Sequence, residues 1–298
     1  MIVLSSLVFL TFFFNKEVVE KHYKEKELKS SYKKIFNKKE WADLVNKMNI
    51  ELKNNPYMID YLIYRGYSLF LLGENEKTIE KKMDFFKLAL IDLRKALAIG
   101  VDAKNINDLY FCIGKIYFYM GVNYYDLAIK YCNKAISLNC KRDDLYYILG
   151  LCYSFIGDYE NSVNNFIELS KNTPSDQVFY AIATIFYKMK DYNNSKIYLD
   201  NIIERTEDKK AKESAYLLLG EILFEERDIK RALVCFDKVL EINEYNAMAY
   251  FYKGEIIYQT GNNTSLARNL WLEARDINPG NQLVKDRLQR VYDKKGRN

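Results

Sequence analysis

The side chains that most often do chemistry in enzymes are sparse along this chain. Its only histidine, His22, lies in a stretch rich in lysine and glutamate, which leaves no histidine-based general base, nucleophile partner or metal ligand elsewhere. Glu221 and Glu225 are one helical turn apart and can share a cleft as acid and base. A solvated or salt-bridged helix face produces such a pair far more often. The sequence therefore predicts no catalytic residue, no cofactor and no metal site.

The cysteines support the same conclusion. There are five of them, an odd number without a C-x-x-C pair, and this argues against a disulfide framework or a zinc site. Cys132 and Cys235 fall at positions where other segments of the chain carry a large apolar residue such as Phe166. We expect the cysteines to be small buried hydrophobic residues.

Small residues recur in pairs, and they indicate helical hairpins. In residues 146–174, apolar residues recur at helical spacing, the pattern breaks at Gly157, resumes, and fades before Pro174. Two antiparallel helices that cross closely need small side chains at the contact. Pairs suited to that role repeat with a period of about 34 to 36 residues: Gly114 and Ala128, Gly150 and Ser162, Ala183 and Ser195, Gly220 and Ala232, and Gly254 and Ala267.

In this pattern the chain resembles the tetratricopeptide repeat family. One unit carries its motif at Tyr146, Leu149, Gly150, Tyr153, Ser162, Phe166, Leu169 and Pro174, and the last carries it at Tyr250, Gly254, Ala267, Trp271, Ala274 and Pro279. The resemblance implies an all-α fold, a right-handed superhelical solenoid of antiparallel helix-turn-helix hairpins with a C-terminal capping helix. Core positions of the second helices are then Cys132, Ala135, Phe166, Leu169, Leu199, Ile202, Phe236, Val239, Trp271 and Ala274.

The same register divides the chain into units. A degenerate first repeat is expected at 25–58, and a unit at 59–106 contains an insert, residues 74–84, that lengthens its second helix. Five further repeats follow at 107–142, 143–175, 176–212, 213–246 and 247–280, and the capping helix at 281–298. A solenoid grows by one hairpin at a time, so we expect one elongated domain rather than several globular ones.

The charge pattern argues against nucleic acid as a partner. The net charge is +5; residues 15–40 and 281–298 each contribute +4, which leaves residues 41–280 at −3. A nucleic-acid groove needs a continuous basic track, and the body of the chain has none.

The N-terminus predicts a membrane attachment. Residues 1–14 are uncharged and mostly apolar, and a charged spacer follows at 15–24. The run is long enough for the apolar part of a signal peptide but shorter than the ~20 residues of a straight membrane span. Because no small-x-small cleavage site follows, we interpret it as an uncleaved anchor. A segment docked on the first repeat and a cleaved signal are the alternatives.

The side of the membrane is indicated in two conflicting ways. No lysine or arginine precedes the apolar run and nine lysines follow it within residues 15–40, which favours a cytoplasmic body by the positive-inside tendency. Envelope-anchored members of the family have the same order of apolar segment, charged spacer and repeats. That resemblance implies a bacterial inner membrane with a periplasmic body, and the cytoplasmic face remains the alternative.

The resemblance also implies where a partner binds. In the family, the first helices line a concave groove, and their side chains not used for packing face it. The matching residues are Tyr67, Phe70, Phe111, Lys115, Phe118, Tyr147, Leu151, Tyr180, Tyr187, Glu221, Phe224, Glu225, Phe251, Glu255 and Tyr258.

This predicted groove is mostly aromatic. Only Lys115 is cationic, so the carboxylate clamp of the chaperone-binding members is absent. The groove suits an amphipathic helix or an extended segment of another protein. Alternatively, several of the aromatic rings pack within the chain, or another part of the same chain fills the groove.

Together these features predict a non-enzymatic, membrane-tethered scaffold for protein–protein interaction. It would assemble or stabilise a cell-envelope complex, such as secretion or flagellar motor machinery, and would bind no nucleic acid and no small-molecule substrate. The competing interpretation is a soluble cytoplasmic regulatory adaptor or a co-chaperone-like repeat protein.

Overall fold

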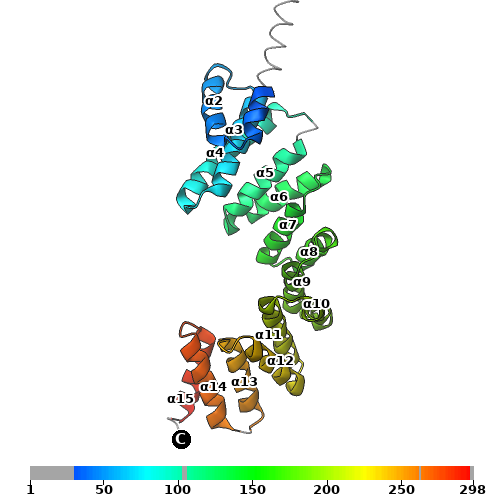
Figure 1. Cartoon of the computed structure of the whole chain (residues 1–298), viewed down its shortest axis with the longest axis vertical. Helices are drawn as coiled ribbons and strands as arrows, with labels where there is room; N and C mark the ends of the chain where they lie inside the picture. The colour runs from blue at the N-terminus through cyan, green and yellow to red at the C-terminus, as the bar shows by residue number, and fades with distance from the viewer. Residues whose placement is uncertain (1–29, 103–105, 262, 296–298) are drawn as a thin grey trace, which may run out of the picture. The chain divides into compact units, whose positions relative to one another are not determined.

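The computed structural model describes residues 30–102, 106–261 and 263–295, and every regular element in them is a helix (Figure 1). The predicted all-α fold is confirmed. The predicted anchor, residues 1–14, and the spacer, residues 15–24, lie outside the described residues. Within the described ranges, no helix combines the length and the apolar character that a bilayer span requires.

The chain divides into two compact units, Met1–Cys152 and Tyr153–Asn298. The described helices before the boundary are residues 30–37, α2 (Trp41–Asn54), α3 (Ile59–Asn75), α4 (Ile79–Ile99), α5 (Ile106–Tyr119), the 3-10 helix η1 (Val122–Tyr124) and α6 (Tyr125–Ser137). The boundary falls within α7 (Asp143–Ile156). The later helices are α8 (Tyr159–Asn172), α9 (Asp176–Lys188), α10 (Tyr192–Arg205), α11 (Lys209–Glu225), α12 (Ile229–Ile242), α13 (Ala247–Gln259), α14 (Thr264–Ile277) and α15 (Gln282–Lys295).

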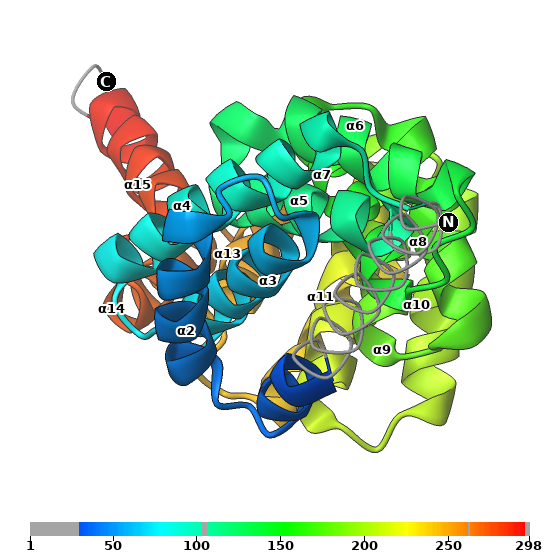
Figure 2. The ribbon, with the colours of Figure 1, turned by 90° about the horizontal axis from the view of Figure 1, so that it is seen from above.

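Consecutive helices pair as hairpins in each unit. In the N-terminal unit, α3 packs against α4 and α5 against α6, and α2 also packs against α3 (Figure 2). In the C-terminal unit, α9 packs against α10, α11 against α12, and α13 against α14. α15 packs on α14 as the predicted capping helix, with Val284, Leu288 and Val291 buried.

The turns between the helices of several hairpins share one local design. Gly157, Lys190 and Arg227 each have a positive φ, at 83°, 61° and 66°, and each is followed by an aspartate. That aspartate caps the second helix, because its side chain accepts a hydrogen bond from the backbone N–H three residues later. A left-handed residue ends the first helix, and an aspartate N-cap starts the next.

The predicted core positions are all buried. The ten second-helix residues named for that role, from Cys132 to Ala274, have at most 4% of their surface exposed. The two predicted small residues also meet in the hairpin of α9 and α10, where Ser195 Oγ donates a hydrogen bond to the backbone oxygen of Ala183 over 2.8 Å.

Helix α4, which contains residues 79–84 of the insert, is longer than the other second helices. α4 has 21 residues, whereas α6, α8, α10, α12 and α14 have 13 or 14. Helix α11 begins at Lys209, one turn before residue 213, where the repeat unit is expected to start. Asp208 is the reason, because its side chain caps the helix by accepting a hydrogen bond from Lys210 N, which lets the helix begin a turn earlier.

The closest helix approaches leave no room for a side chain. A methyl group added at Gly254 would lie 2.5 Å from Nε1 of the fully buried Trp271 and 3.1 Å from the backbone oxygen of Ala267. At Gly220, the added group would lie 2.7 Å from the ring of Phe236. At these two positions, the glycine of the first helix is matched to a large ring from the second helix.

We expect Gly254→Ala to lower the free energy of unfolding by about 1–3 kcal/mol, because the tryptophan ring and the facing backbone must move apart. Urea unfolding followed by circular dichroism measures the change. Gly280→Ala is the matched control, since its added methyl group would meet only Asn278 Oδ1 at 3.5 Å. Equal effects of the two substitutions would contradict the proposed helix crossing.

Candidate functional site

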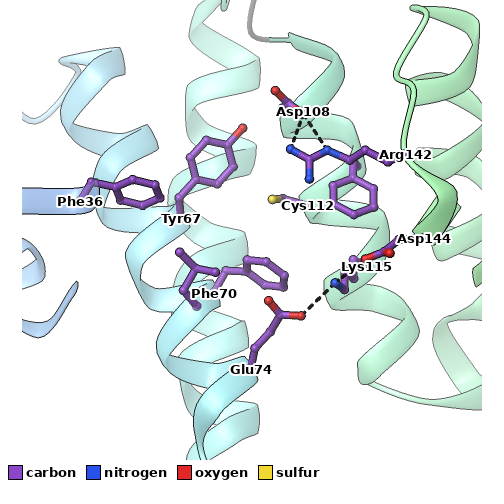
Figure 3. Close-up of a pocket in the computed structure, with 11 residues that line it drawn as sticks. Phe36, Tyr67, Phe70, Glu74, Asp108, Cys112, Lys115, Arg142 and Asp144 are labelled. Atoms are coloured by element: carbon purple, nitrogen blue, oxygen red, sulfur yellow. Dashed lines mark hydrogen bonds and ion pairs between the residues drawn. The ribbon is translucent and has the colours of Figure 1, made fainter. Parts of the chain in front are cut away.

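The N-terminal unit contains a cavity of about 400 Å³ on its first-helix side (Figure 3). We call it the first-helix cavity. It is lined by Phe36, Tyr67, Phe70, Leu71, Glu74, Asp108, Phe111, Cys112, Lys115, Arg142 and Asp144. Four of these, Tyr67, Phe70, Phe111 and Lys115, were predicted from the repeat register.

Helical spacing brings the lining residues together. Tyr67, Phe70 and Glu74 follow one another along a single face of α3, at intervals of three and four residues. Asp108, Phe111 or Cys112, and Lys115 repeat that spacing on α5. Because α3 and α5 are the first helices of consecutive hairpins, their exposed faces converge on one cavity.

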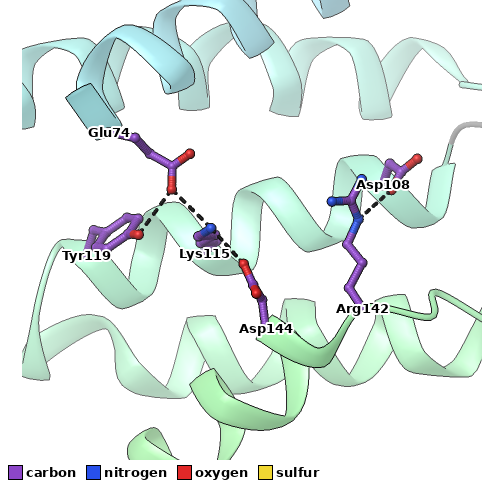
Figure 4. Close-up of polar contacts among 6 residues, drawn as sticks. All are labelled: Glu74, Asp108, Lys115, Tyr119, Arg142 and Asp144. Atoms are coloured by element: carbon purple, nitrogen blue, oxygen red, sulfur yellow. Dashed lines mark hydrogen bonds and ion pairs between the residues drawn. The ribbon is translucent and has the colours of Figure 1, made fainter. Parts of the chain in front are cut away.

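Lys115 connects three consecutive first helices. Its Nζ lies 3.0 Å from Glu74 Oε1 on α3 and 2.9 Å from Asp144 Oδ2 on α7 (Figure 4). The hydroxyl of Tyr119 donates a further hydrogen bond to Glu74 over 3.1 Å. Burial lowers the pKa of Lys115, but the hydrogen bonds from its two carboxylate partners outweigh this and leave its pKa raised. Lys115 therefore stays charged but is already fully engaged.

Arg142 bounds the other end of the cavity. Its Nε and Nη2 lie 3.1 and 3.0 Å from Asp108 Oδ1, and its guanidinium stands 4.8 Å from the centre of the Phe111 ring. This is a cation–π contact that also orients the ring. Each cation at the cavity thus has at least one carboxylate partner, so the cavity does not present an unpaired positive charge to a ligand.

Tyr67 is the polar group of the cavity that remains available. Its ring points into the cavity beside Phe36 (Figure 3), and its hydroxyl has no hydrogen-bond partner among the described residues. Burial raises the pKa of Tyr67 well above its usual value, so the hydroxyl is a neutral donor and acceptor. It can bond a backbone carbonyl or N–H of a bound segment.

Cys112 does not add a nucleophile to the site. The side chain is 8% exposed, and burial raises the pKa of its thiol, so the thiolate that reacts is suppressed. Within the described residues, no group of histidine, cysteine, aspartate and glutamate side chains is placed to hold a metal ion. All five cysteines are free and buried, as expected from the sequence.

The remaining predicted groove residues near this cavity differ in exposure. Tyr147 on α7 is 48% exposed and Leu151 is half-buried. Phe118 stacks on Tyr125 of its own hairpin at a ring separation of 6.0 Å. Phe118 therefore packs within the chain, as the alternative interpretation of the aromatic residues anticipated.

In the C-terminal unit, the predicted residues of α9 and α11 form a second aromatic cluster. Tyr187 packs against Tyr192 at 5.9 Å, and Phe224 against Tyr252 at 5.8 Å. Tyr180 lines a separate cavity of about 220 Å³. Glu221 is partly buried, whereas Glu225 is exposed.

The predicted residues of α13 are occupied by the capping helix. Arg287 of α15 forms a two-pronged ion pair with Glu255, and its guanidinium stacks over Tyr258 at 4.7 Å and Trp271 at 4.9 Å. Phe251 is 5% exposed and belongs to the core between α13, α14 and α15. Here another part of the same chain fills the groove.

The family model described as tetratricopeptide repeat matches residues 108–139, 143–176, 176–209 and 213–246. The chain contains tetratricopeptide repeats. The matched segments include α5 to α12, and therefore the α5 side of the first-helix cavity. The family is a protein-interaction module, so the repeats indicate a scaffold that binds other proteins.

Solved structures support the fold of the tetratricopeptide repeats. The C-terminal part of a repeat-containing protein from Cytophaga hutchinsonii aligns with a TM-score of 0.62 at 18% identity, over 87% of this chain and 98% of that one. YrrB, described as a repeat protein with an unusual peptide-binding site, aligns with a TM-score of 0.50 at 22% identity, over 66% and 97%. PilF of Pseudomonas aeruginosa aligns with a TM-score of 0.52 at 18% identity, over 76% and 97%. No curated protein sequence matches the chain significantly.

Several residues of the site were not predicted from the repeat register. Phe36 comes from the helical segment 30–37, and Arg142 precedes α7. Glu74 lies at the start of the insert, one helical turn beyond Phe70. Glu74 lies seven residues after Tyr67, and Lys115 lies seven residues after Asp108. Seven residues are about two helical turns, so each pair shares one face of its helix. This interval is the sequence signal that could have identified Glu74 and Asp108.

The Glu221 carboxyl makes the stability of the folded tetratricopeptide repeats depend on pH. The pKa of Glu221 is raised from 4.5 to about 7, because burial and the nearby Glu225 carboxylate raise it by more than Tyr252 lowers it. The folded state therefore holds a proton that the unfolded state releases at lower pH. The contribution of this carboxyl to stability is lost as the pH rises from 4.5 to 7.

We expect Glu221→Gln to raise the melting temperature relative to wild type at pH 8, because it removes a buried negative charge, and to change it little at pH 5. Thermal unfolding at the two pH values measures this. Glu225→Gln is the matched control one turn away, and its effect at pH 8 should be smaller because Glu225 is exposed. A Glu221→Gln effect that does not depend on pH would show that the carboxyl is not protonated in the folded state.

Proposed function

We propose that the chain is a membrane-tethered tetratricopeptide scaffold that holds a segment of another protein in the first-helix cavity. The observation that carries this proposal is the convergence of three first helices on one cavity, with aromatic walls and an unbonded tyrosine hydroxyl. Tetratricopeptide repeats bind protein partners. A cavity formed by consecutive first helices provides a partner with both apolar surface and polar contacts.

The chemistry of the cavity favours an uncharged apolar anchor in the partner. Phe36, Phe70 and Phe111 provide ring faces that can enclose a large side chain. Lys115 and Arg142 are bonded to carboxylates, so a free terminal carboxylate would have to displace an existing ion pair. The partner segment is therefore one with apolar or aromatic anchor residues, either an amphipathic helix or an extended strand.

The tether is the apolar run of residues 1–14, followed by the lysine-rich spacer. In this proposal it attaches the scaffold to a bacterial inner membrane with a periplasmic body. The scaffold then assembles or stabilises a complex of the cell envelope, such as secretion or flagellar motor machinery. The nine lysines that follow the run within residues 15–40 favour the second candidate: a cytoplasmic body that acts as a regulatory adaptor.

A crosslinking pull-down from native membranes tests the tethered function. The full-length chain is compared with a version lacking residues 1–14, and the retained proteins are identified by mass spectrometry. We expect the full-length chain to fractionate with membranes and to retain envelope proteins that the shortened chain loses. Equal retention of soluble cytoplasmic proteins by both forms would contradict the tether and favour the adaptor.

We expect Tyr67→Phe to weaken binding of a peptide from the retained partner about fivefold, because one hydrogen bond of roughly 1 kcal/mol is lost. Fluorescence polarisation with a labelled peptide measures the affinity, and the melting temperature should not change. Tyr245→Phe, at a residue that is 70% exposed, is the matched control. Identical affinities of wild type and Tyr67→Phe would rule out the proposed role of this hydroxyl.

A further inference from the structure

The N-terminal unit has a second groove, on a different face of α3 from the first-helix cavity. It runs between α2 and α4, and we call it the outer groove. Its walls are formed by Val45, Asn49, Lys53, Leu88, Ile91 and Lys95. Two adjoining cavities, of about 540 and 150 Å³, make up the groove and share Asn49 and Ile91.

The α4 wall of the outer groove is apolar and exposed. Leu88 and Ile91 are 50% and 62% exposed, and they lie one turn apart on the same face. In the other hairpins, the corresponding pairs are Leu127 and Lys130, Asn161 and Asn164, Asn194 and Ile197, Arg231 and Val234, and Leu266 and Asn269. Among these second helices, α4 is the one with an aliphatic side chain at both positions.

The floor of the outer groove is polar but already satisfied. Arg65 binds both carboxylate oxygens of Asp92 at 2.7 Å, and its Nη1 donates to Asn49 Oδ1 over 2.8 Å. The Asp92 side chain is 3% exposed. The ion pair connects α3 with α4, and the hydrogen bond to Asn49 connects Arg65 with α2. Together these contacts hold the two walls of the outer groove in place.

One end of the outer groove is basic. Lys53 and Lys95 both lie in the C-terminal halves of their helices, and neither has a carboxylate partner among the described residues. Lys95 stands 4.4 Å from the centre of the Tyr57 ring, which is itself 69% exposed. A negative group placed between the two lysines would therefore meet two unpaired positive charges.

We propose that the outer groove binds an amphipathic helix of a partner protein, with an apolar stripe against Leu88 and Ile91 and acidic residues against Lys53 and Lys95. The distance along α4 from Leu88 to Lys95 is about 10 Å at ~1.5 Å per residue. Two turns of a bound helix match this length, with apolar residues at i and i+3 or i+4 and a carboxylate at i+7. The charge complementarity selects an acidic helix over a basic one. This site is separate from the first-helix cavity and does not rest on the proposed function.

Two designed helical peptides of about 15 residues, or four turns, test the proposal. They share one leucine stripe and differ only at the flanking positions, which carry glutamate in one peptide and lysine in the other. Binding to the full chain is measured by fluorescence polarisation. We expect the glutamate peptide to bind at least tenfold more tightly than the lysine peptide, and the Lys53→Glu, Lys95→Glu double variant to reverse this preference.

Ile91→Asp should reduce the affinity of the glutamate peptide at least tenfold. Val234→Asp is the matched control, because Val234 is 57% exposed at the corresponding position of α12. Tyr67→Phe should have no effect on this peptide, which distinguishes the outer groove from the first-helix cavity. Failure of the glutamate peptide to bind, equal binding of both peptides, or undiminished binding by Ile91→Asp would each overturn the proposal.

Discussion

The close approach of two helices within each hairpin is the constraint on which the rest of the structure depends. At Gly220 and Gly254, the first helix lies so close to a ring of the second helix that an added methyl group would collide with it. At Ala183, the contact is completed by a hydrogen bond from Ser195. Close-packed interiors transmit such constraints over long distances. The small residues fix the rotation of a first helix about its own axis. That rotation determines which of its side chains face away from the second helix.

The candidate site follows from that rotation. With Gly66 and Gly114 turned toward α4 and α6, the next residues, Tyr67 and Lys115, are turned toward the first-helix side. Carboxylates from neighbouring hairpins neutralise the two cations at the cavity. These ion pairs connect the hairpins to one another, and a partner would therefore bind mainly by burying apolar surface. At the C-terminal end, Arg287 makes the equivalent contact with Glu255 and closes the array.

The repeat architecture could be predicted from the sequence because it depends on local spacing. The small-residue pairs and the apolar period identified the hairpins, the buried second-helix positions and the longer α4. Contacts between hairpins could not be predicted in the same way. Arg287 lies 32 residues from Glu255 and Arg142 lies 34 from Asp108, and a single sequence does not show which of several charged residues on adjacent helices will pair.

For the same reason, the sequence could not separate groove residues from packing residues. Phe251 and Tyr147 fall at equivalent positions of their repeats, yet Phe251 is 5% exposed and Tyr147 is 48% exposed. The ion pair between Arg65 and the buried Asp92 was also not predicted, because the repeat pattern gives no reason to expect an ion pair there.

Site-specific photocrosslinking can determine whether the first-helix cavity holds a partner segment. A photoreactive phenylalanine derivative is placed at Tyr67 in one version of the full-length chain and at the exposed Tyr245 in another, and both are irradiated in cells. A partner segment held in the first-helix cavity would give a discrete crosslinked protein from position 67 and none from position 245. Crosslinking from position 245 alone, with none from position 67, would contradict the binding of a partner in this cavity.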